Sequence, residues 1–411
     1  MSTTYEWFAG IDWGDAHHEV CVMNNEREVV LRRSVKHDGA ALAALMKALE
    51  ELTAHRLERI AVAIETPRGA VVSTLLERQI AVFSINPKQL DRFRDRHTVA
   101  GAKDDRRDAF VLADSLRTDT PLYRRVKLGE AKLVELRELV RMHEDLKEEG
   151  VRLGNRLRDQ LQRYYPQIVE LGSVHDESWL LALVERAPTP SRGRRLALAK
   201  IGSILQKHGI RRLDEAAVHA VLSKPALVVA AGVVDASVRH VMQLLPRLRL
   251  VHEQQREVNA SMKKILDELS EGNDDANGRE HRDAKVLLSL AGAGTIVCAT
   301  MLAEASQPLG DRDYRTLRAH CGTAPVTKQS GKTRYVQRRR ACNRLLVNAV
   351  YFWAMNAIRN DALAKAHYAR LRARGHTHGR ALRGVADRLL AIAIAMLKKG
   401  GLYDPSRRKA A

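Results

Sequence analysis

A chain of 411 residues is long enough for roughly two or three domains with hydrophobic cores of their own. Its 69 Lys and Arg residues outnumber 49 Asp and Glu residues, and the formal net charge of +20 favours a polyanionic partner, most commonly nucleic acid. Because the sequence has no apolar run that could span a bilayer, no recognisable signal peptide and no Cys-x-x-Cys pair among its four cysteines, we expect a cytosolic protein with reduced thiols rather than a membrane-embedded or secreted one.

The first part of the chain predicts alternating strands and helices. The predicted strands are short apolar runs that end at polar or turn-forming residues: 7–11, 19–23, 28–31, 60–64 and 80–85. Helices are predicted at 40–54 and 71–78. This alternation indicates a mixed α/β sheet, in which catalytic groups gather at strand ends and at nearby helix starts.

Carboxylates occur at such positions in three separate segments. Asp12 and Glu65 each follow a buried strand, and Asp104, Asp105 and Asp108 begin an apolar helix in which Asp108 can share a face with either of the other two. Taken alone, the helix start fits a solvated, ion-paired first turn, because acidic residues favour helix N-termini. Four carboxylates from three segments instead suit a pair of Mg²⁺ ions, which take oxygen ligands and clamp a phosphodiester.

Beyond Pro121 the composition changes to charged helix with two apolar seams of heptad spacing. The first seam is Leu136, Leu139, His143, Leu146, Gly150, Leu153 and Leu157, and the second is Leu244, Leu248, Val251, Gln255, Val258, Met262, Ile265 and Leu269. Such seams can pack within one chain or between chains, and the sequence does not decide between these arrangements. The intervening segment, about 166–235, contains four prolines and is predicted to be an inserted helical subdomain.

Two features of the C-terminal part suggest contacts with nucleic acid. Gly292 and Gly294 separate two predicted helices, a form that suits either a helix-hairpin-helix phosphate contact or tight helix packing. Ser330 lies in a predicted glycine-flanked loop, where its hydroxyl is open to approach, but no histidine stands within a few residues to activate it. The next fifteen residues contain no acidic side chain, and their cations are Lys332, Arg334, Arg338, Arg339, Arg340 and Arg344.

These motifs together resemble a known family. Gly10-Ile11-Asp12-Trp13-Gly14, Ile64-Glu65-Thr66 and Lys103-x-Asp105-x-x-Asp108-Ala109 are similar to the RuvC-like, ribonuclease-H-fold domain of DEDD-type insertion-sequence transposases. These are relatives of the pilin-gene invertases and include bridge-RNA-guided recombinases. The first motif also occurs in actin-like ATPases, but these need a second Gly-rich phosphate loop, which the sequence lacks. Gly322-x-x-Pro325, Ser330-Gly331 and Asn343-Arg344-Leu345-Leu346 resemble the family's transposase domain, although Cys342 replaces its usual glycine.

The resemblance implies a set of site residues. Asp12, Glu65, Asp105 and Asp108 are the implied ligands of two Mg²⁺ ions, with Mn²⁺ as the alternative metal, so the resemblance selects Asp105 over Asp104. Ser330 is the implied covalent nucleophile. The implied nucleic-acid contacts are Lys103, Gly292, Gly294, Lys332, Arg334, Arg338, Arg339, Arg340, Asn343 and Arg344.

The resemblance also implies a domain organisation and a set of partners. We expect a RuvC-like α/β domain at 1–125, coiled-coil dimerisation helices at 126–270 with the insertion at 166–235, and an all-α transposase domain at 280–411. The implied partners are the DNA of element ends and target, a structured guide RNA, and further copies of the chain whose domains form composite active sites. The implied location is the bacterial cytoplasm.

Two other interpretations of the sequence differ in the chemistry that they assign to Ser330 and the carboxylates. In the first, the chain is a metal-dependent nuclease like a Holliday-junction resolvase, which cuts with water while Ser330 only touches phosphate. In the second, the carboxylates are structural and the chain is a nucleic-acid-binding scaffold. Only the recombinase forms a covalent bond between serine and DNA.

Overall fold

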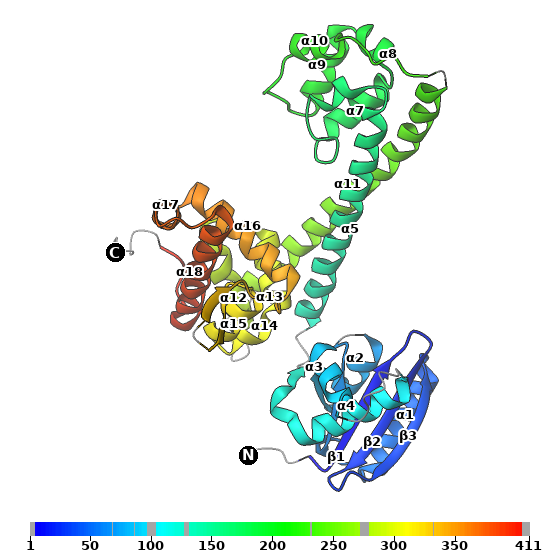
Figure 1. Ribbon diagram of the computed structural model, residues 1–411, viewed down its shortest axis with the longest axis vertical. Helices are drawn as coiled ribbons and strands as arrows, with labels where there is room; N and C mark the ends of the chain where they lie inside the picture. Colours follow the sequence, from blue (N-terminus) through cyan, green and yellow to red (C-terminus); the bar gives the residue numbers. More distant parts are fainter. Residues whose placement is uncertain are drawn as a thin grey trace. The chain divides into compact units, whose positions relative to one another are not determined.

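The computed structural model describes residues 5–67, 69–85, 87–96, 104–126, 131–230, 232–271, 279–331 and 333–404. The chain divides into two compact units, residues 1–130 and 131–411 (Figure 1). The predicted domains 126–270 and 280–411 both fall almost entirely within the second unit, and the three-domain division stays a prediction. The predicted linker around the boundary at 270–280 lies largely outside the described residues.

The first unit is built on a six-stranded mixed sheet with strand order β3-β2-β1-β4-β5-β6. The strands are β1 Trp7–Trp13, β2 His17–Asn24, β3 Val29–Lys36, β4 Ile60–Ile64, β5 Ala81–Ser84 and β6 Arg124–Val126. β1, β4 and β5 are parallel neighbours, whereas β2, β3 and β6 are each antiparallel to the strand beside them. The mixed α/β prediction for this part of the chain is confirmed.

Helices cover both faces of this sheet. They are α1 Gly39–Leu52, α2 Ala70–Glu77, α3 Pro87–Arg94 and α4 Asp105–Asp119, with short 3-10 helices at Leu57–Arg59 and Thr120–Leu122. Because side chains alternate along a strand, Ala9 and Ile11 of β1 pack with α1 and α2, while Phe8 packs on the other face with α3 and α4. The central strand is therefore buried on both sides.

The contact between α4 and β1 is unusually close. A Cβ atom on Gly10 would lie 2.0 Å from the carbonyl oxygen of Ala109 and 2.6 Å from the backbone nitrogen of Ala113. Only a residue without a side chain leaves room for the helix backbone at this point of the strand. Gly10 thus sets how closely the first turns of α4 approach β1.

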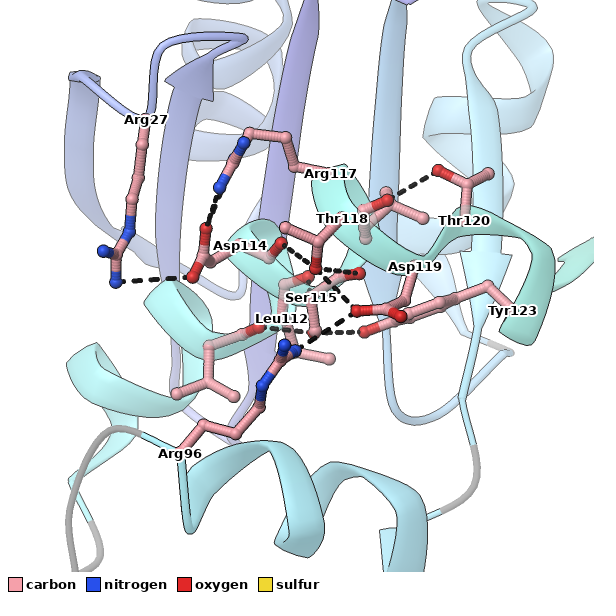
Figure 2. A network of polar contacts seen from close by, with 12 residues as sticks. Arg27, Arg96, Leu112, Asp114, Ser115, Arg117, Thr118, Asp119, Thr120 and Tyr123 are labelled. Atoms are coloured by element: carbon pink, nitrogen blue, oxygen red, sulfur yellow. Dashed lines mark hydrogen bonds and ion pairs between the residues drawn. The ribbon is translucent and has the colours of Figure 1, made fainter.

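Polar contacts hold the C-terminal half of the same helix in place. Figure 2 shows Asp114 of α4 between two guanidinium groups, Arg117 at 2.8 Å and Arg27 at 3.4 Å. The hydroxyl of Ser115 bonds that of Tyr123, whose pKa is raised to about 12 by burial. The helix is therefore fixed by packing at its start and by a polar network near its end.

In the second unit, two long helices, α5 Ala131–Gln162 and α11 Val233–Glu271, pack along each other in antiparallel directions (Figure 1). Lys132 forms an ion pair of 3.0 Å with Glu268, whereas Gly150, farther along α5, faces Val251. The two predicted seams are largely buried, although Leu139 and Leu146 remain half-buried. The seams therefore pack against each other within one chain, and self-association stays a prediction that would need other surfaces.

Smaller helices complete both ends of this pair. The segment between α5 and α11 forms α6 Pro166–Val169, α7 Ser178–Arg186, α8 Pro190–Arg194, α9 Leu198–Lys207 and α10 Glu215–Leu222, so the inserted segment is helical as predicted. After α11 come α12 Arg279–Ser289, α13 Thr295–Glu304, α14 Ser306–Gly310, α15 Tyr314–His320, α16 Arg344–Asn360, α17 Ala362–Ala373 and α18 His378–Lys399.

The prediction of an all-α C-terminal domain was wrong in one respect. The segment around Ser330 is not a loop but a two-stranded antiparallel hairpin, β7 Val326–Ser330 and β8 Thr333–Gln337. Both strands are exposed almost throughout, so they lack the one-sided apolar alternation that marks a strand packed on a core. Their hydrogen-bonded ladder, rather than burial of side chains, defines the hairpin.

All four cysteines are free thiols. In the part of the chain that the structure describes, none of the helices combines the length and apolar character needed to cross a membrane.

A methyl group added at Gly10 should destabilise the first unit. Gly10→Ala would force α4 away from β1, an overpacking that costs about 1–3 kcal/mol or more. We expect hydrogen-exchange mass spectrometry of the full chain to show lost protection in β1 and α4. Gly39→Ala is the matched control, because its Cβ would meet nothing within 4 Å and it lies at the start of α1. Equal protection in the two variants would contradict this role of Gly10.

Candidate active site

Asp12 and Glu65 stand side by side at one edge of the sheet. β1 and β4 run parallel with Ile11 opposite Ile64, so the residues that follow these two are also aligned. By the alternation along each strand, both carboxylates belong to the face that carries α4, because Phe8 of β1 and Ala63 of β4 pack on that face. The sheet register therefore brings together two of the predicted ligands.

The first turn of α4 supplies the other carboxylates and distinguishes between Asp104 and Asp105. Asp104 is the N-cap residue, and its side chain accepts a hydrogen bond of 3.2 Å from the backbone nitrogen of Arg106. Asp105 is exposed, and Asp108 is buried with only 1% of its surface accessible. Asp104 thus has a structural role, while Asp105 and Asp108 lie in the first turn of α4, directly before the residues that approach Gly10.

Asp108 is engaged by a guanidinium group that the sequence did not single out. Nε and Nη2 of Arg94, at the end of α3, donate to the two carboxylate oxygens at 2.7 and 2.8 Å. Burial lowers the pKa of Arg94, but hydrogen bonds and the charge of Asp108 outweigh this effect and raise it. The buried carboxylate is therefore neutralised within the chain by a bidentate ion pair.

The donor set fits a hard divalent cation in its chemistry. Carboxylate oxygens are the ligands that Mg²⁺ prefers, and the four predicted ligands belong to one edge of one sheet and the helix that covers it. Among the described residues, however, no three His, Cys, Asp or Glu side chains are gathered closely enough to hold an ion as they stand. Arg94 would have to release Asp108 before that carboxylate could bind a metal, so the predicted metal site stays a prediction.

Ser330 lies at the tip of the β7–β8 hairpin. It pairs with Thr333 of β8, and Gly331, the next residue, has φ of +55°, a conformation that favours glycine. Its hydroxyl is exposed and has no hydrogen-bond partner among the described residues. The hairpin contains no histidine or carboxylate, so a group that activates this hydroxyl has to come from outside the hairpin.

The predicted basic contacts divide into free and occupied side chains. Arg334, Arg338 and Arg340 are exposed along and just after β8, and Arg339 is half-buried. Arg344 instead forms an ion pair of 2.6 Å with Glu148. Lys103 and Lys332 lie outside the described residues.

Asn343 caps α16. Its Oδ1 accepts from the backbone nitrogens of Leu345 and Leu346, and its Nδ2 donates to Glu304 at 2.7 Å. Cys342 does not adopt a positive φ, so this turn does not depend on the glycine that the family has there. The structure gives Asn343 a structural role, and its contact with nucleic acid stays a prediction.

Gly292 and Gly294 have different surroundings in the turn between α12 and α13. Gly292 has φ of +78°, and a Cβ there would lie 2.6 Å from the backbone nitrogen of Ala357 in α16, so helix packing requires this glycine. Gly294 is exposed, has open space around it, and precedes α13 without a side-chain cap. The backbone at Gly294 is thus the more accessible to a phosphate group.

The sequence interpretation missed Arg94 because it missed α3. That helix is charged and begins at Pro87, and among its described side chains only Leu90 and Phe93 pack in the core. The spacing of these two apolar residues, three apart, was the only local sign of a helix. The pairing of Arg94 with Asp108 depends on how α3 and α4 pack, which no local pattern reveals.

Comparisons with known proteins identify both halves of the chain. A family model for DEDD transposases of the IS110 type, described as "Transposase", matches residues 9–166. A second model, described as "Transposase IS116/IS110/IS902 family", matches residues 284–369. The first match contains the four carboxylates and the second contains Ser330.

Individual relatives agree with these matches. A Sinorhizobium fredii protein named as transposase y4uE is 44% identical over 215 residues, which cover 52% of this chain and 60% of that relative. An uncharacterized 42 kDa protein of the insertion element IS900 from Mycobacterium paratuberculosis is 26% identical over 98% of both chains. A Streptomyces coelicolor protein named as the mini-circle transposase for IS117 is 32% identical over 97% of this chain and 96% of its own length. The chain therefore belongs to the IS110/IS116 family of insertion-sequence transposases.

Proposed function

We propose that this transposase recombines the DNA of its insertion element by covalent serine chemistry assisted by carboxylate-bound metal, with a RuvC-like first unit. The proposal rests on Asp12 and Glu65, which directly follow the last aligned pair of β1 and β4 and belong to the sheet face covered by α4, and on the first turn of that helix. Asp105 and Asp108 occupy that turn. Such a set of carboxylates has no evident role in packing the sheet, but it suits the binding of divalent metal.

In the proposed reaction, Ser330 attacks a phosphodiester of the DNA backbone. A bond forms between Oγ of Ser330 and phosphorus, one phosphorus–oxygen bond of the backbone breaks, and the proton of Oγ ends on the hydroxyl of the released strand end. The exposure of Ser330 at the end of β7 supports this role, because the hydroxyl is not buried within its own unit. Strand exchange follows when another strand end attacks the phosphoserine bond.

The carboxylates would hold the metal for this step. Asp12, Glu65, Asp105 and Asp108 are the proposed ligands of two Mg²⁺ ions, or of Mn²⁺. When bound, the ions supply the positive charge that polarises the phosphodiester and favours loss of the serine proton. Arg334, Arg338 and Arg340 would hold the DNA or RNA backbone beside the hairpin through charge-assisted hydrogen bonds.

Two further parts of the proposal rest on the resemblance. We expect an element-encoded structured RNA to guide the choice of target, which agrees with the net charge of +20 but is not specified by any single residue. We also expect copies of the chain to assemble, so that the carboxylates of one copy and Ser330 of another act on one phosphodiester. Surfaces other than the buried seams of α5 and α11 would mediate this assembly.

Loss of the Ser330 hydroxyl should abolish the covalent intermediate. The chain is incubated with Mg²⁺, element-end DNA and RNA transcribed from the element, and a protein–DNA adduct is sought on a denaturing gel. We expect an adduct with the parent protein and none with Ser330→Ala. Thr333→Ala, which removes the exposed hydroxyl paired across the hairpin, should retain it.

Each other outcome identifies a different function. Cleaved DNA without an adduct would indicate a nuclease that uses water, and bound but intact DNA would indicate a scaffold. Either result with the parent protein, or equal loss of the adduct in Thr333→Ala, contradicts the proposed role of Ser330. The same reaction without RNA tests the need for a guide.

Asp105, and not Asp104, should be required for the same adduct. Asp105→Asn removes a charged ligand and should abolish adduct formation. Asp104→Asn keeps a side-chain oxygen for the N-cap, so it should stay active and alter stability by no more than about 0.5 kcal/mol, because Asn and Asp are equivalent caps. Loss of activity in Asp104→Asn but not in Asp105→Asn would show that Asp104, and not Asp105, is the metal ligand.

Removal of the Arg94 charge should weaken the fold but strengthen metal binding. Arg94→Gln leaves the buried Asp108 without its cation, which should cost about 3 kcal/mol of stability when divalent ions are absent. Because a metal ion would no longer compete with a guanidinium group, isothermal titration calorimetry should show tighter binding of Mn²⁺. Lower hydrogen-exchange protection in α4 should report the loss of stability.

The matched control is Arg117→Gln, which removes an ion pair to Asp114 on the same helix. It should lose stability without a gain in Mn²⁺ affinity. Unchanged Mn²⁺ affinity in Arg94→Gln would show that Asp108 is not a ligand.

A further inference from the structure

A pocket of about 290 Å³ lies within the second unit, between the end of β8 and the turn that joins α17 to α18. Part of its lining is apolar, and the rest includes charged side chains from segments far apart in the sequence. These are Arg318, Arg338, Arg339, Arg380, Arg383 and Asp387. The pocket thus combines residues of the predicted basic run with arginines of α18 that no motif singled out.

The only carboxylate in this wall is already occupied. Arg318 donates to the two oxygens of Asp387 at 2.9 and 2.7 Å, and the hydroxyl of Thr323 donates to the same carboxylate at 2.8 Å. This bidentate ion pair cancels the charge of Asp387. It leaves the other four guanidinium groups of the pocket without a neutralising partner on the wall.

Those four guanidinium groups crowd one another. Among the residues that the structure describes, none of Arg338, Arg339, Arg380 and Arg383 forms an ion pair. Burial lowers the pKa of Arg383, and the positive charges of Arg338 and Arg380 lower it further. Such an arrangement is unfavourable in the free protein and becomes favourable when an anion binds.

Two buried polar atoms of the wall also lack partners. Nε of Arg339 and Nδ1 of His376 are shielded from solvent, and neither has a hydrogen-bond partner in the described part of the chain. Burial of an unpaired donor or acceptor costs free energy that a bound polar ligand can recover. This observation is independent of the charge balance, and it points to the same conclusion.

We propose that this pocket binds one phosphate group of a nucleic-acid backbone and so anchors the strand that lies along the Ser330 hairpin, an inference that rests on the proposed function. Guanidinium groups match phosphate oxygens with paired hydrogen bonds, which explains the use of arginine rather than lysine here. Arg338 and Arg339 also line a neighbouring cavity of about 460 Å³ together with Arg340. The two cavities share Arg338 and Arg339, so the proposed phosphate site adjoins a second cavity lined by arginines.

The test measures binding without cleavage. All variants carry Ser330→Ala and are studied in EDTA, so that the result does not depend on the covalent step or on metal. Fluorescence anisotropy follows a labelled single-stranded DNA and an RNA of the same sequence over a range of salt concentrations. Arg380→Gln with Arg383→Gln should weaken binding about tenfold and reduce the slope of log Kobs against log salt by about 0.7 to 1.4, because one or two counterions fewer are released.

The control removes the same charge from the same helix. Arg388→Gln with Lys398→Gln alters two exposed cations of α18 outside the pocket and should leave the slope near that of the parent. Arg380→Lys with Arg383→Lys keeps the charge and should restore the slope. A reduced slope with DNA, with RNA or with both supports the pocket and identifies the polymer. An unchanged slope with both, or an equal reduction in the control pair, overturns the proposal.

Thermal unfolding gives a second readout that does not need nucleic acid. Inorganic pyrophosphate should raise the Tm of the parent and of the control pair, but not that of Arg380→Gln with Arg383→Gln. Without pyrophosphate, the Gln pair should melt no lower than the parent, because the substitutions relieve repulsion between like charges. A lower Tm together with an undiminished response to pyrophosphate would show that the two arginines are structural.

Discussion

The close contact of α4 with β1 at Gly10 is the constraint on which the candidate site depends. Without a side chain at Gly10, the backbone of α4 at Ala109 and Ala113 comes close to β1, the strand that contains Asp12. Parallel pairing of β1 and β4 then aligns Asp12 with Glu65. One small residue in the middle of a buried strand thus positions carboxylates from three segments, and the mixed sheet serves the chemistry by fixing their register.

The two units differ in whether the charged side chains of their candidate sites have counter-charges within the chain. In the first, the buried carboxylate of Asp108 has a cation from its own chain, Arg94, in the position where a metal ion is proposed. In the second, arginines around the β7–β8 hairpin and α18 have no such counter-charge within the described residues. Electrostatics therefore favours a cation at the first site, in exchange for Arg94, and an anion at the second. This difference suits the proposed catalysis on a polyanion with bound metal.

The sequence predicted those elements whose patterns are local and linked to burial. β1, β4 and α4 were recognised because apolar runs end at polar residues, and the carboxylates at these ends marked the candidate site. The hairpin that carries Ser330 was missed because its strands are exposed almost throughout. Helix α3 was missed because, among its described side chains, only Leu90 and Phe93 mark its buried face. The roles of Arg94 and Arg383 were not predicted for another reason. Each depends on side chains from a segment distant in the sequence, and no local periodicity reports such pairings.

The heptad seams show the same limit at a larger scale. Periodicity establishes that α5 and α11 each need a partner along one face, but it does not name that partner. Because both helices emerge from one helical subdomain, whose core includes Leu157 of α5 and Leu244 of α11, their seams meet at high effective concentration within the chain. A second copy of the chain that paired with either seam would have to displace this contact and would disrupt that core. The proposed assembly would therefore use the outer faces of these helices, which leave the pairing of α5 and α11 intact.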